Sequence, residues 1–180
     1  MESFLRLSQT IVESPDLNPR ECRIWNRLFA PPGKPTGGPV KGRYEAEIGG
    51  LVKVTGTSKG RAARQDMRGF GSQWSGNAQL FWGCPQSGSE LTVSFEVTEA
   101  GSGLRFGFTK APDYGTFEVS LDGKKIGENV DLYDPKVVHS VHDVSDLKTA
   151  SGRHTLKFQC VGKNERSKRF FFGLDYVDVT

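Results

Sequence analysis

The feature that most constrains the fold is a run of alternating apolar and polar residues that ends in a tight turn, within residues 109–133. In residues 117–121 the sequence Phe-Glu-Val-Ser-Leu has the period of a strand with one buried face. Asp122-Gly123 follows, and such a pair tolerates the positive φ angles of a type I′ turn. The pattern therefore predicts a β-hairpin in which residues 124–127 return antiparallel to the first strand.

Short apolar runs of this kind, separated by turns rich in Gly, fill most of the chain after residue 41. The runs are 43–48, 52–55, 65–70, 79–82, 91–97, 104–108, 117–121, 137–144, 154–161 and 170–179. About ten strands at close spacing, without intervening helical patterns, predict an all-β fold. The most typical architecture for such a chain is an antiparallel β-sandwich of the jelly-roll type.

The beginning of the chain has a different pattern. Residues 1–30 carry apolar side chains at roughly helical spacing, which predicts a short, partly helical N-terminal extension. Trp25, Leu28 and Phe29 form an apolar group, so we expect this extension to dock on the sandwich. Residues 31–40 are dense in Pro and Gly and predict an extended linker, which leaves residues 41–180 for the jelly-roll domain.

Charge and hydropathy argue against two classes of partner. The net charge of +3 is small for 180 residues and the basic residues do not gather, so no nucleic-acid partner is predicted. No apolar stretch approaches the roughly 20 residues that cross a bilayer, so no membrane partner is predicted either. Met1-Glu2 does not begin a visible signal peptide, but a fragment of an exported protein would start in the same way.

The cysteines predict neither a metal knuckle nor a disulfide framework. Cys22, Cys84 and Cys160 are an odd number and lack CxxC spacing. Cys160 follows Leu156 and Phe158 at the period of a strand, so the simplest expectation for it is a place in the core.

Two acidic stretches need an explanation. Glu45 and Glu47 are two residues apart and share one face of a predicted strand, where their like charges repel. Asp175 shares its predicted face with Val177 and Val179, which places it near the core edge, where it must be paired or ligated. The alternative is that both glutamates face solvent and that Asp175 accepts backbone hydrogen bonds.

Several phrases of the sequence resemble known modules. YEAE at residues 44–47 and LDYVDV at 174–179 look like the first and last strands of carbohydrate-binding modules of the galactose-binding-like jelly-roll type. A second resemblance is to a β-sandwich module of large planctomycete proteins, often found beside glycoside-hydrolase-like domains. It is carried by residues 109–138, 151–167 and 170–179. The resemblance runs from about residue 43 to 179.

The resemblance implies a calcium site. In the sugar-binding relatives, two acidic residues of the first strand and an Asp of the last strand bind a structural calcium ion, and the matching positions here are Glu45, Glu47 and Asp175. Calcium takes six to eight hard oxygen ligands, so carboxylates from the first and last strands suit it.

A sugar site needs an exposed ring beside short polar groups, because a pyranose offers apolar C–H patches and hydroxyls. The candidates are Trp74, Asp113, Tyr114, Tyr133 and Asn164. Family sites of this kind combine a ring with an Asn from the loop before the last strand, which the resemblance assigns to Trp74 and Asn164. The alternative is that Tyr114 or Tyr133 plugs the end of the sandwich.

The sequence does not predict an enzyme. It has no GxSxG, HExxH or GxxxxGK[ST] motif, and Asp131 with Asp134 is a weak basis for glycoside hydrolysis. The interpretation is a non-catalytic accessory module of a larger polysaccharide-processing protein. Its expected partners are an oligo- or polysaccharide and a neighbouring catalytic domain. The sequence leaves its location unknown, and as part of an exported larger protein it would be extracellular or periplasmic. The alternatives are a structural or assembly jelly roll and, behind it, a glycoside hydrolase fragment.

Overall fold

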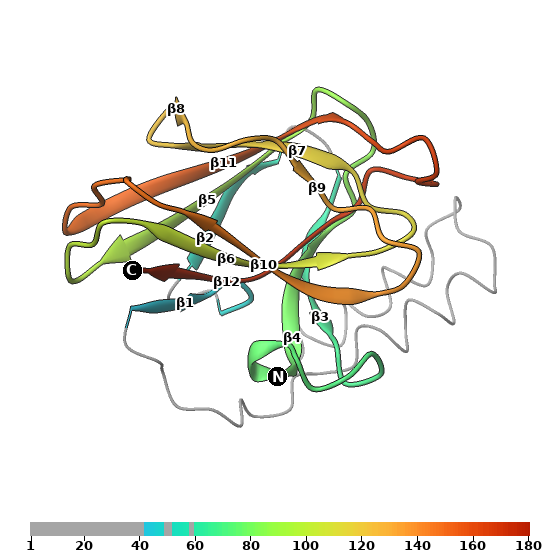
Figure 1. Ribbon diagram of the computed structural model, residues 1–180, viewed down its shortest axis with the longest axis horizontal. Coiled ribbons are helices and arrows are strands. Elements are labelled where there is room, and N and C mark those ends of the chain that lie inside the picture. The colour runs from blue at the N-terminus through green and yellow to red at the C-terminus, as the bar shows by residue number, and fades with distance from the viewer. Residues whose placement is uncertain (1–41, 49–51, 58–59) are drawn as a thin grey trace, which may run out of the picture. The chain divides into compact units, whose positions relative to one another are not determined.

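The computed structural model describes residues 42–48, 52–57 and 60–180, which form two β-sheets (Figure 1). The predicted N-terminal extension (1–30) and linker (31–40) lie outside the described residues. The strands are β1 (Arg43–Glu45), β2 (Val52–Thr57), β3 (Ala62–Asp66), β4 (Ala78–Trp82), β5 (Glu90–Val97), β6 (Leu104–Lys110), β7 (Thr116–Leu121), β8 (Lys124–Lys125), β9 (Val130–Asp131), β10 (Val138–Val144), β11 (Gly152–Gly162) and β12 (Phe172–Val179).

The first sheet has the strand order β10-β6-β12-β4-β3, with β1 also paired to β12. The second sheet has the order β2-β5-β11-β7-β8, with β9 also paired to β7. All of these strand pairs are antiparallel. From β4 onward the chain crosses repeatedly between the sheets, so that β5, β7 and β11 alternate with β6, β10 and β12. The predicted antiparallel jelly-roll sandwich is confirmed.

Aromatic rings fill the core between the sheets. The ring of Phe172 lies 4.7 Å from that of Phe158 and 4.9 Å from that of Phe117, measured between centroids. Trp82 packs on the same ring at 6.3 Å. All four side chains are almost fully buried. Burial of each contributes about 1.5–3 kcal/mol, so the alternating runs of the sequence supply the force that holds the two sheets together.

The predicted hairpin is confirmed in its details. β7 and β8 pair antiparallel, and the turn residues Asp122 and Gly123 have φ angles of 48° and 84°. Positive φ at both central residues is the signature of a type I′ turn. The Asp122 carboxylate also accepts a hydrogen bond from Thr155 N at 2.8 Å, so the turn is tied to β11.

Two strand boundaries differ from the sequence prediction. The strand expected at 65–70 lies instead at 62–66, because Phe70 N donates to Met67 O and closes a turn. The first strand ends at Glu45, since Ile48 N donates to Glu45 O in the same way. Glu47 therefore lies beyond the strand, where its side chain is not held to strand alternation.

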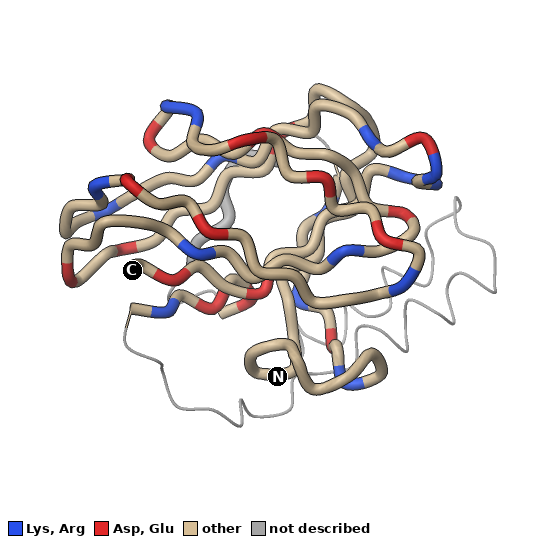
Figure 2. Tube along the Cα trace, in the orientation of Figure 1, with Lys and Arg blue, Asp and Glu red and all other residues tan. Residues whose placement is uncertain are grey.

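The surface carries both signs of charge. Figure 2 shows Lys and Arg interspersed with Asp and Glu over the strands and loops of the described chain. Among the described residues, there is no helix of the length and apolar character needed to cross a membrane.

Candidate metal site and loop cluster

The first candidate site lies where β1 meets β12. Arg43 pairs with Asp178, and Glu45 pairs with Tyr176. The Arg43 guanidinium forms two hydrogen bonds of 2.7 Å to the Asp178 carboxylate and stacks 3.6 Å from the centre of the Tyr176 ring. These contacts hold the short first strand against the last one.

A β-bulge directs Asp175 toward the same place. Leu174 of β12 pairs with Phe108 of β6. The neighbouring residue of β6, Gly107, pairs with Tyr176, so Asp175 has no partner on β6 and is an inserted residue. Strict alternation would turn Asp175 toward the core with Val177, as the sequence suggested. The bulge instead re-aims the side chain, which is the usual effect of an inserted residue. Asp175 is fully buried, and its carboxylate faces the two glutamates rather than the Phe-rich core.

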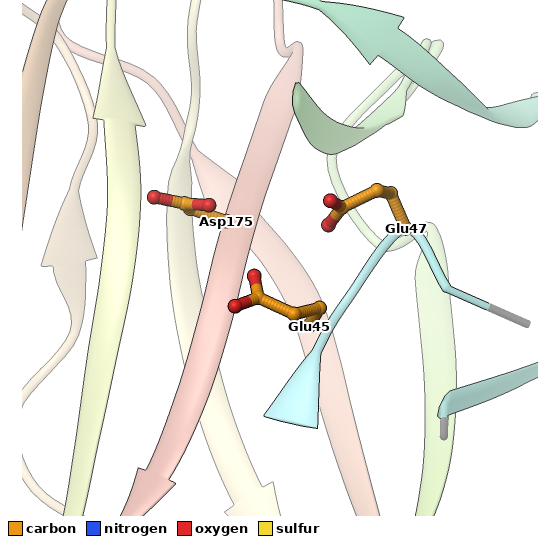
Figure 3. Close-up of side chains that lie close together, drawn as sticks. All are labelled: Glu45, Glu47 and Asp175. Atoms are coloured by element: carbon orange, nitrogen blue, oxygen red, sulfur yellow. The ribbon is translucent and has the colours of Figure 1, made fainter. Parts of the chain in front are cut away.

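Three carboxylates therefore converge in one small volume. Each of Glu45, Glu47 and Asp175 offers an oxygen, and these oxygens lie within 4.8 Å of one another. Figure 3 shows the three groups gathered beside β12, with both glutamates coming from β1 and the segment that follows it. The calcium ligands implied by the sequence resemblance are thus brought together by the fold, although Asp175 lies more than a hundred residues from the two glutamates in the chain.

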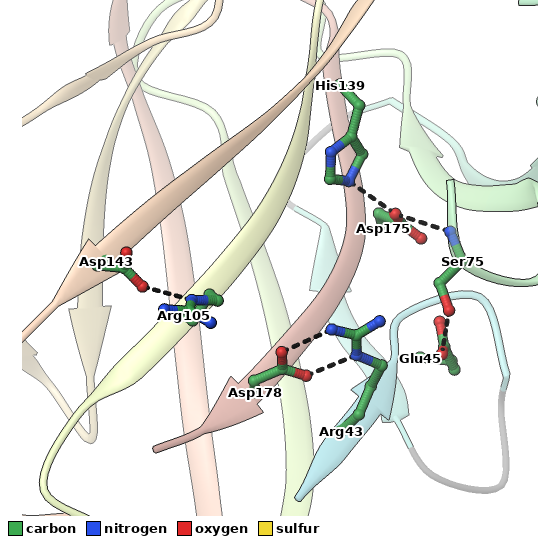
Figure 4. A network of polar contacts seen from close by, with 8 residues as sticks. All are labelled: Arg43, Glu45, Ser75, Arg105, His139, Asp143, Asp175 and Asp178. Carbon is green, nitrogen blue, oxygen red and sulfur yellow. Dashed lines mark hydrogen bonds and ion pairs between the residues drawn. The ribbon is translucent and has the colours of Figure 1, made fainter. Parts of the chain in front are cut away.

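The surrounding side chains satisfy only part of this acidic trio. Ser75 Oγ donates to Glu45 Oε1 at 2.5 Å, and Ser75 N donates to Asp175 Oδ2 at 3.0 Å. His139 Nε2 lies 2.8 Å from the same Asp175 oxygen (Figure 4). Glu45 Oε2, Glu47 Oε2 and Asp175 Oδ1 are buried and have no hydrogen-bond partner within the described structure. One orphaned oxygen from each carboxylate is the pattern that a bound cation would complete.

Burial raises the pKa of all three carboxyl groups. The pKa of Glu47 rises to about 8, first because of burial and then because the Glu45 and Asp175 carboxylates are close. Burial also raises the pKa of Glu45, and the hydrogen bond from Ser75 lowers it by less. The pKa of Asp175 is raised by burial in the same way, and the contact with His139 only partly offsets this. Without a cation the trio disfavours its charged form. Hard oxygen ligands in this arrangement are those that calcium prefers.

The turn that carries Ser75 is shaped for this site. Residues 75–77 form a short 3-10 turn in which Gly76 has a φ of 57°. A Cβ at Gly76 would lie 3.2 Å from Glu47 Oε1. Glycine is suited to this position because it adopts positive φ without strain and leaves room for the carboxylate. Sequence patterns gave no signal for Ser75 or His139, which reach the trio from other elements.

Trp74 is placed differently from the prediction. Its side chain is 3% exposed, and its Nε1 donates to Thr109 Oγ1 at 2.7 Å. The ring packs edge-on against His139, with centroids 5.8 Å apart. The expectation that Trp74 presents an exposed face for a sugar is therefore wrong. Its indole N–H and ring both have protein partners, so the residue packs behind the acidic trio.

The second candidate site is a loop cluster formed by residues 111–115, 131–134 and 163–171. Backbone hydrogen bonds join the three segments: Leu132 N donates to Gly115 O, and Gly115 N donates to Phe171 O, each at 3.0 Å. Ser167 Oγ adds a bond of 2.7 Å to Tyr114 O. These contacts fix the three segments as one unit.

Three of the predicted sugar contacts lie in the loop cluster with part of their surface exposed: Asp113, Tyr133 and Asn164. Asp131 links two of them, because its carboxylate accepts bonds from Tyr133 N at 3.0 Å and from Asn164 Nδ2 at 3.1 Å. Burial raises the pKa of Asp113. Asp131 was not among the predicted contacts, and its role as a bridge became visible only in the fold.

Tyr114 follows the alternative prediction. Its side chain is 5% exposed, and its hydroxyl accepts a hydrogen bond from Gln79 Nε2 at 3.2 Å. The ring lies against Phe81, with centroids 6.4 Å apart. Tyr114 thus packs beneath the loop cluster and does not offer an exposed ring.

With the fold and the sites described, the chain can be compared with known proteins. No family model and no curated protein matches it. Among solved structures, a Paenibacillus xanthan lyase matches with a TM-score of 0.64 and 20% identity over 85% of this chain and 14% of the lyase. A family 35 carbohydrate-binding module from Clostridium thermocellum matches with a TM-score of 0.50 and 17% identity over 77% of this chain and 97% of the module.

A cycloisomaltooligosaccharide glucanotransferase from Paenibacillus also matches, with a TM-score of 0.50 and 18% identity over 81% of this chain and 18% of the enzyme. The chain therefore spans less than a fifth of the lyase and of the glucanotransferase, but nearly the whole of the binding module. At these identities the likeness establishes the fold, which is a β-sandwich shared with domains of carbohydrate-related proteins.

Proposed function

We propose that this chain is a non-catalytic carbohydrate-binding module of a larger, exported polysaccharide-processing protein, stabilised by a calcium ion. The loop cluster binds an oligo- or polysaccharide, and a neighbouring catalytic domain of the same protein acts on it. The module works outside the cytoplasm, in an extracellular or periplasmic setting.

The extent of the structural matches supports an accessory role. The clostridial carbohydrate-binding module is matched over 97% of its length, so a sandwich of this size is a complete module in that protein. The xanthan lyase is matched over only 14% of its length, so a similar sandwich occurs there as a small part of a long chain. Both arrangements suit a unit that binds carbohydrate while another domain performs chemistry.

The observation that carries the proposal is the polar chemistry of the loop cluster. The Asn164 side-chain amide has two N–H donors, and only one is used by Asp131. The Asp131 carboxylate keeps acceptor capacity beyond its bonds to Tyr133 N and Asn164. An amide donor, a carboxylate acceptor and the partly exposed ring of Tyr133 meet the needs of a sugar that offers hydroxyls and C–H patches.

The acidic trio supports the calcium part of the proposal. Glu45, Glu47 and Asp175 would hold the ion, and the orphaned oxygens would be its ligands. When bound, the ion neutralises three converging negative charges and links the first strand to the last. Its role is structural, because the trio and the loop cluster use different residues.

A glycan-array screen of the whole chain, followed by titration calorimetry on the glycans it binds, tests the proposal. Asn164→Ala should weaken binding by about 1–3 kcal/mol, or roughly 5- to 150-fold, because a donor to the sugar and the partner of Asp131 are lost together. Asn129→Ala is the matched control, since Asn129 is exposed and its amide oxygen accepts only from Lys125 of β8.

The control variant should bind as tightly as wild type. An array without any bound glycan would contradict the proposal and favour the structural or assembly alternative. Equal affinity of wild type and Asn164→Ala for every bound glycan would contradict the assignment of the site to the loop cluster.

A further inference from the structure

Two buried cysteines have no part in either candidate site. Cys84 lies in the segment 83–89, which joins β4 of the first sheet to β5 of the second, and Cys160 lies in β11 of the second sheet. Each is 1% exposed. The third cysteine, Cys22, lies outside the described residues.

Backbone hydrogen bonds hold the segment 83–89 against β11 at Cys160. Cys160 N donates to Ser89 O at 2.9 Å, and Gly88 N donates to Cys160 O at 2.7 Å. Ser87 Oγ adds a contact of 3.4 Å to the same carbonyl oxygen. The segment cannot move away from Cys160 without breaking these bonds.

The two thiols interact with each other within this frame, and both are free in this structure. This interaction lowers the pKa of the Cys160 thiol and, together with burial, raises that of Cys84. Each thiol also contacts a backbone carbonyl, from Cys84 Sγ to Gln86 O at 3.4 Å and from Cys160 Sγ to Gly162 O at 3.5 Å. The fold therefore places the two thiols beside each other, although the residues are far apart in the sequence.

We propose that Cys84 and Cys160 form a disulfide that ties the segment between β4 and β5 to β11 when the chain folds in the presence of a low-molecular-weight disulfide such as oxidised glutathione. The thiolate of one cysteine attacks one sulfur of the oxidant, forms a mixed disulfide and releases one thiol. The other cysteine then loses its proton and attacks the sulfur of the first cysteine, which releases the second thiol. Two protein thiols are oxidised and one small disulfide is reduced to two thiols.

The reaction belongs to folding because both sulfur atoms are buried in the folded chain, where glutathione does not reach them. Once formed, the bond closes the chain between residues 84 and 160. A loop of this length constrains the unfolded chain strongly, so the melting temperature should rise by on the order of 10 °C. The proposal departs from the sequence-based expectation that the cysteines form no disulfide framework, since the pairing depends on contacts between distant segments.

The test is to refold the reduced whole chain from urea in a buffer of reduced and oxidised glutathione, alkylate the free thiols and map the peptides without reduction. The expected result is one peptide pair that joins Cys84 to Cys160, with Cys22 left outside the bond. The refolded chain should also melt about 10 °C higher, and the same chain refolded in dithiothreitol should not show this shift.

Two variants sharpen the test. Cys22→Ser should keep the linked peptide and the redox-dependent shift, whereas the double variant Cys84→Ala/Cys160→Ala should lose the shift. Peptide mapping of the wild type decides the matter even where the double variant fails to fold. The proposal is overturned if Cys84 and Cys160 both remain open to alkylation after refolding, if either pairs with Cys22, or if the linked form melts no higher than the reduced one.

Discussion

Removal of one negative charge from the acidic trio should stabilise the metal-free chain at alkaline pH. Glu47→Gln replaces a carboxylate by an amide of nearly the same shape, in a place where burial and two neighbouring carboxylates raise the pKa to about 8. An unfolded chain holds Glu47 near its ordinary pKa of 4.5. The folded chain therefore binds more protons than the unfolded chain between these two pH values.

The sign and size of the effect follow from proton linkage. Stability from this group is fully present below pH 4.5 and is lost as the pH rises through about 8, because the folded state must then accept an unfavourable charge. A rise in the pKa of Glu47 from 4.5 to about 8 corresponds to a loss of about 5 kcal/mol of folding free energy. At a few degrees per kcal/mol, the wild type in EDTA should lose roughly 10 °C of melting temperature over this range.

Melting curves from pH 5 to pH 8.5, recorded in EDTA and again in calcium, measure this effect. Glu47→Gln should lose much less stability with rising pH than wild type, and Glu128→Gln, at an exposed position in a turn, should behave as wild type. Calcium at a hundredfold excess over its Kd should add about 2.7 kcal/mol to wild type and clearly less to Glu47→Gln. Identical melts of wild type and Glu47→Gln across this pH range, with and without calcium, would refute the described trio.

Three further predictions concern packing and charge elsewhere. Trp74→Ala should lower the free energy of unfolding by about 3–5 kcal/mol in urea titrations, because the ring is buried and its N–H donates a hydrogen bond to Thr109. A variant as stable as wild type would contradict this placement. Gly107→Ala should lower the free energy of unfolding by about 1–3 kcal/mol and weaken calcium binding, because the new Cβ would lie 2.6 Å from the Tyr176 ring beside the bulge. An unchanged melting curve would count against this close packing. Burial lowers the pKa of His154, but hydrogen bonds to Asp122 and to the Ala150 carbonyl raise it by more, so NMR titration should place this pKa above 6.5. Stability should then fall as the pH rises through the pKa of the folded chain, and a measured pKa below 6.5 would disprove this charge arrangement.

The hairpin and the core were predictable because their signals are local. Alternation in residues 117–121 and the Asp122-Gly123 pair specify strand, turn and return without reference to the rest of the chain. The identity of the acidic trio came from the resemblance of the first and last strands to known modules. Its geometry did not, since a single inserted residue at Asp175 reverses the face that alternation assigns to it.

The placements that the sequence could not show depend on contact between distant segments, whereas the shifted strand boundaries depend on local turns. Trp74 sits in a polar, Gly-rich stretch that suggests an exposed loop, yet Thr109 and His139 cover it from two other strands. Cys84 and Cys160 are 76 positions apart and meet because the segment after β4 continues the pairing of β11. Such contacts leave no periodic trace in the sequence.

The most direct test of the proposed function is NMR mapping of the loop cluster during titration with a glycan that the array identifies. The isotopically labelled whole chain should show shifts concentrated at the backbone amides of residues 111–115, 131–134 and 163–171, with Asn164 among the largest. The amides of residues 74–77, beside the acidic trio, should move little. Shifts centred on residues 74–77, or spread without a centre over both sheets, would contradict a carbohydrate site in the loop cluster.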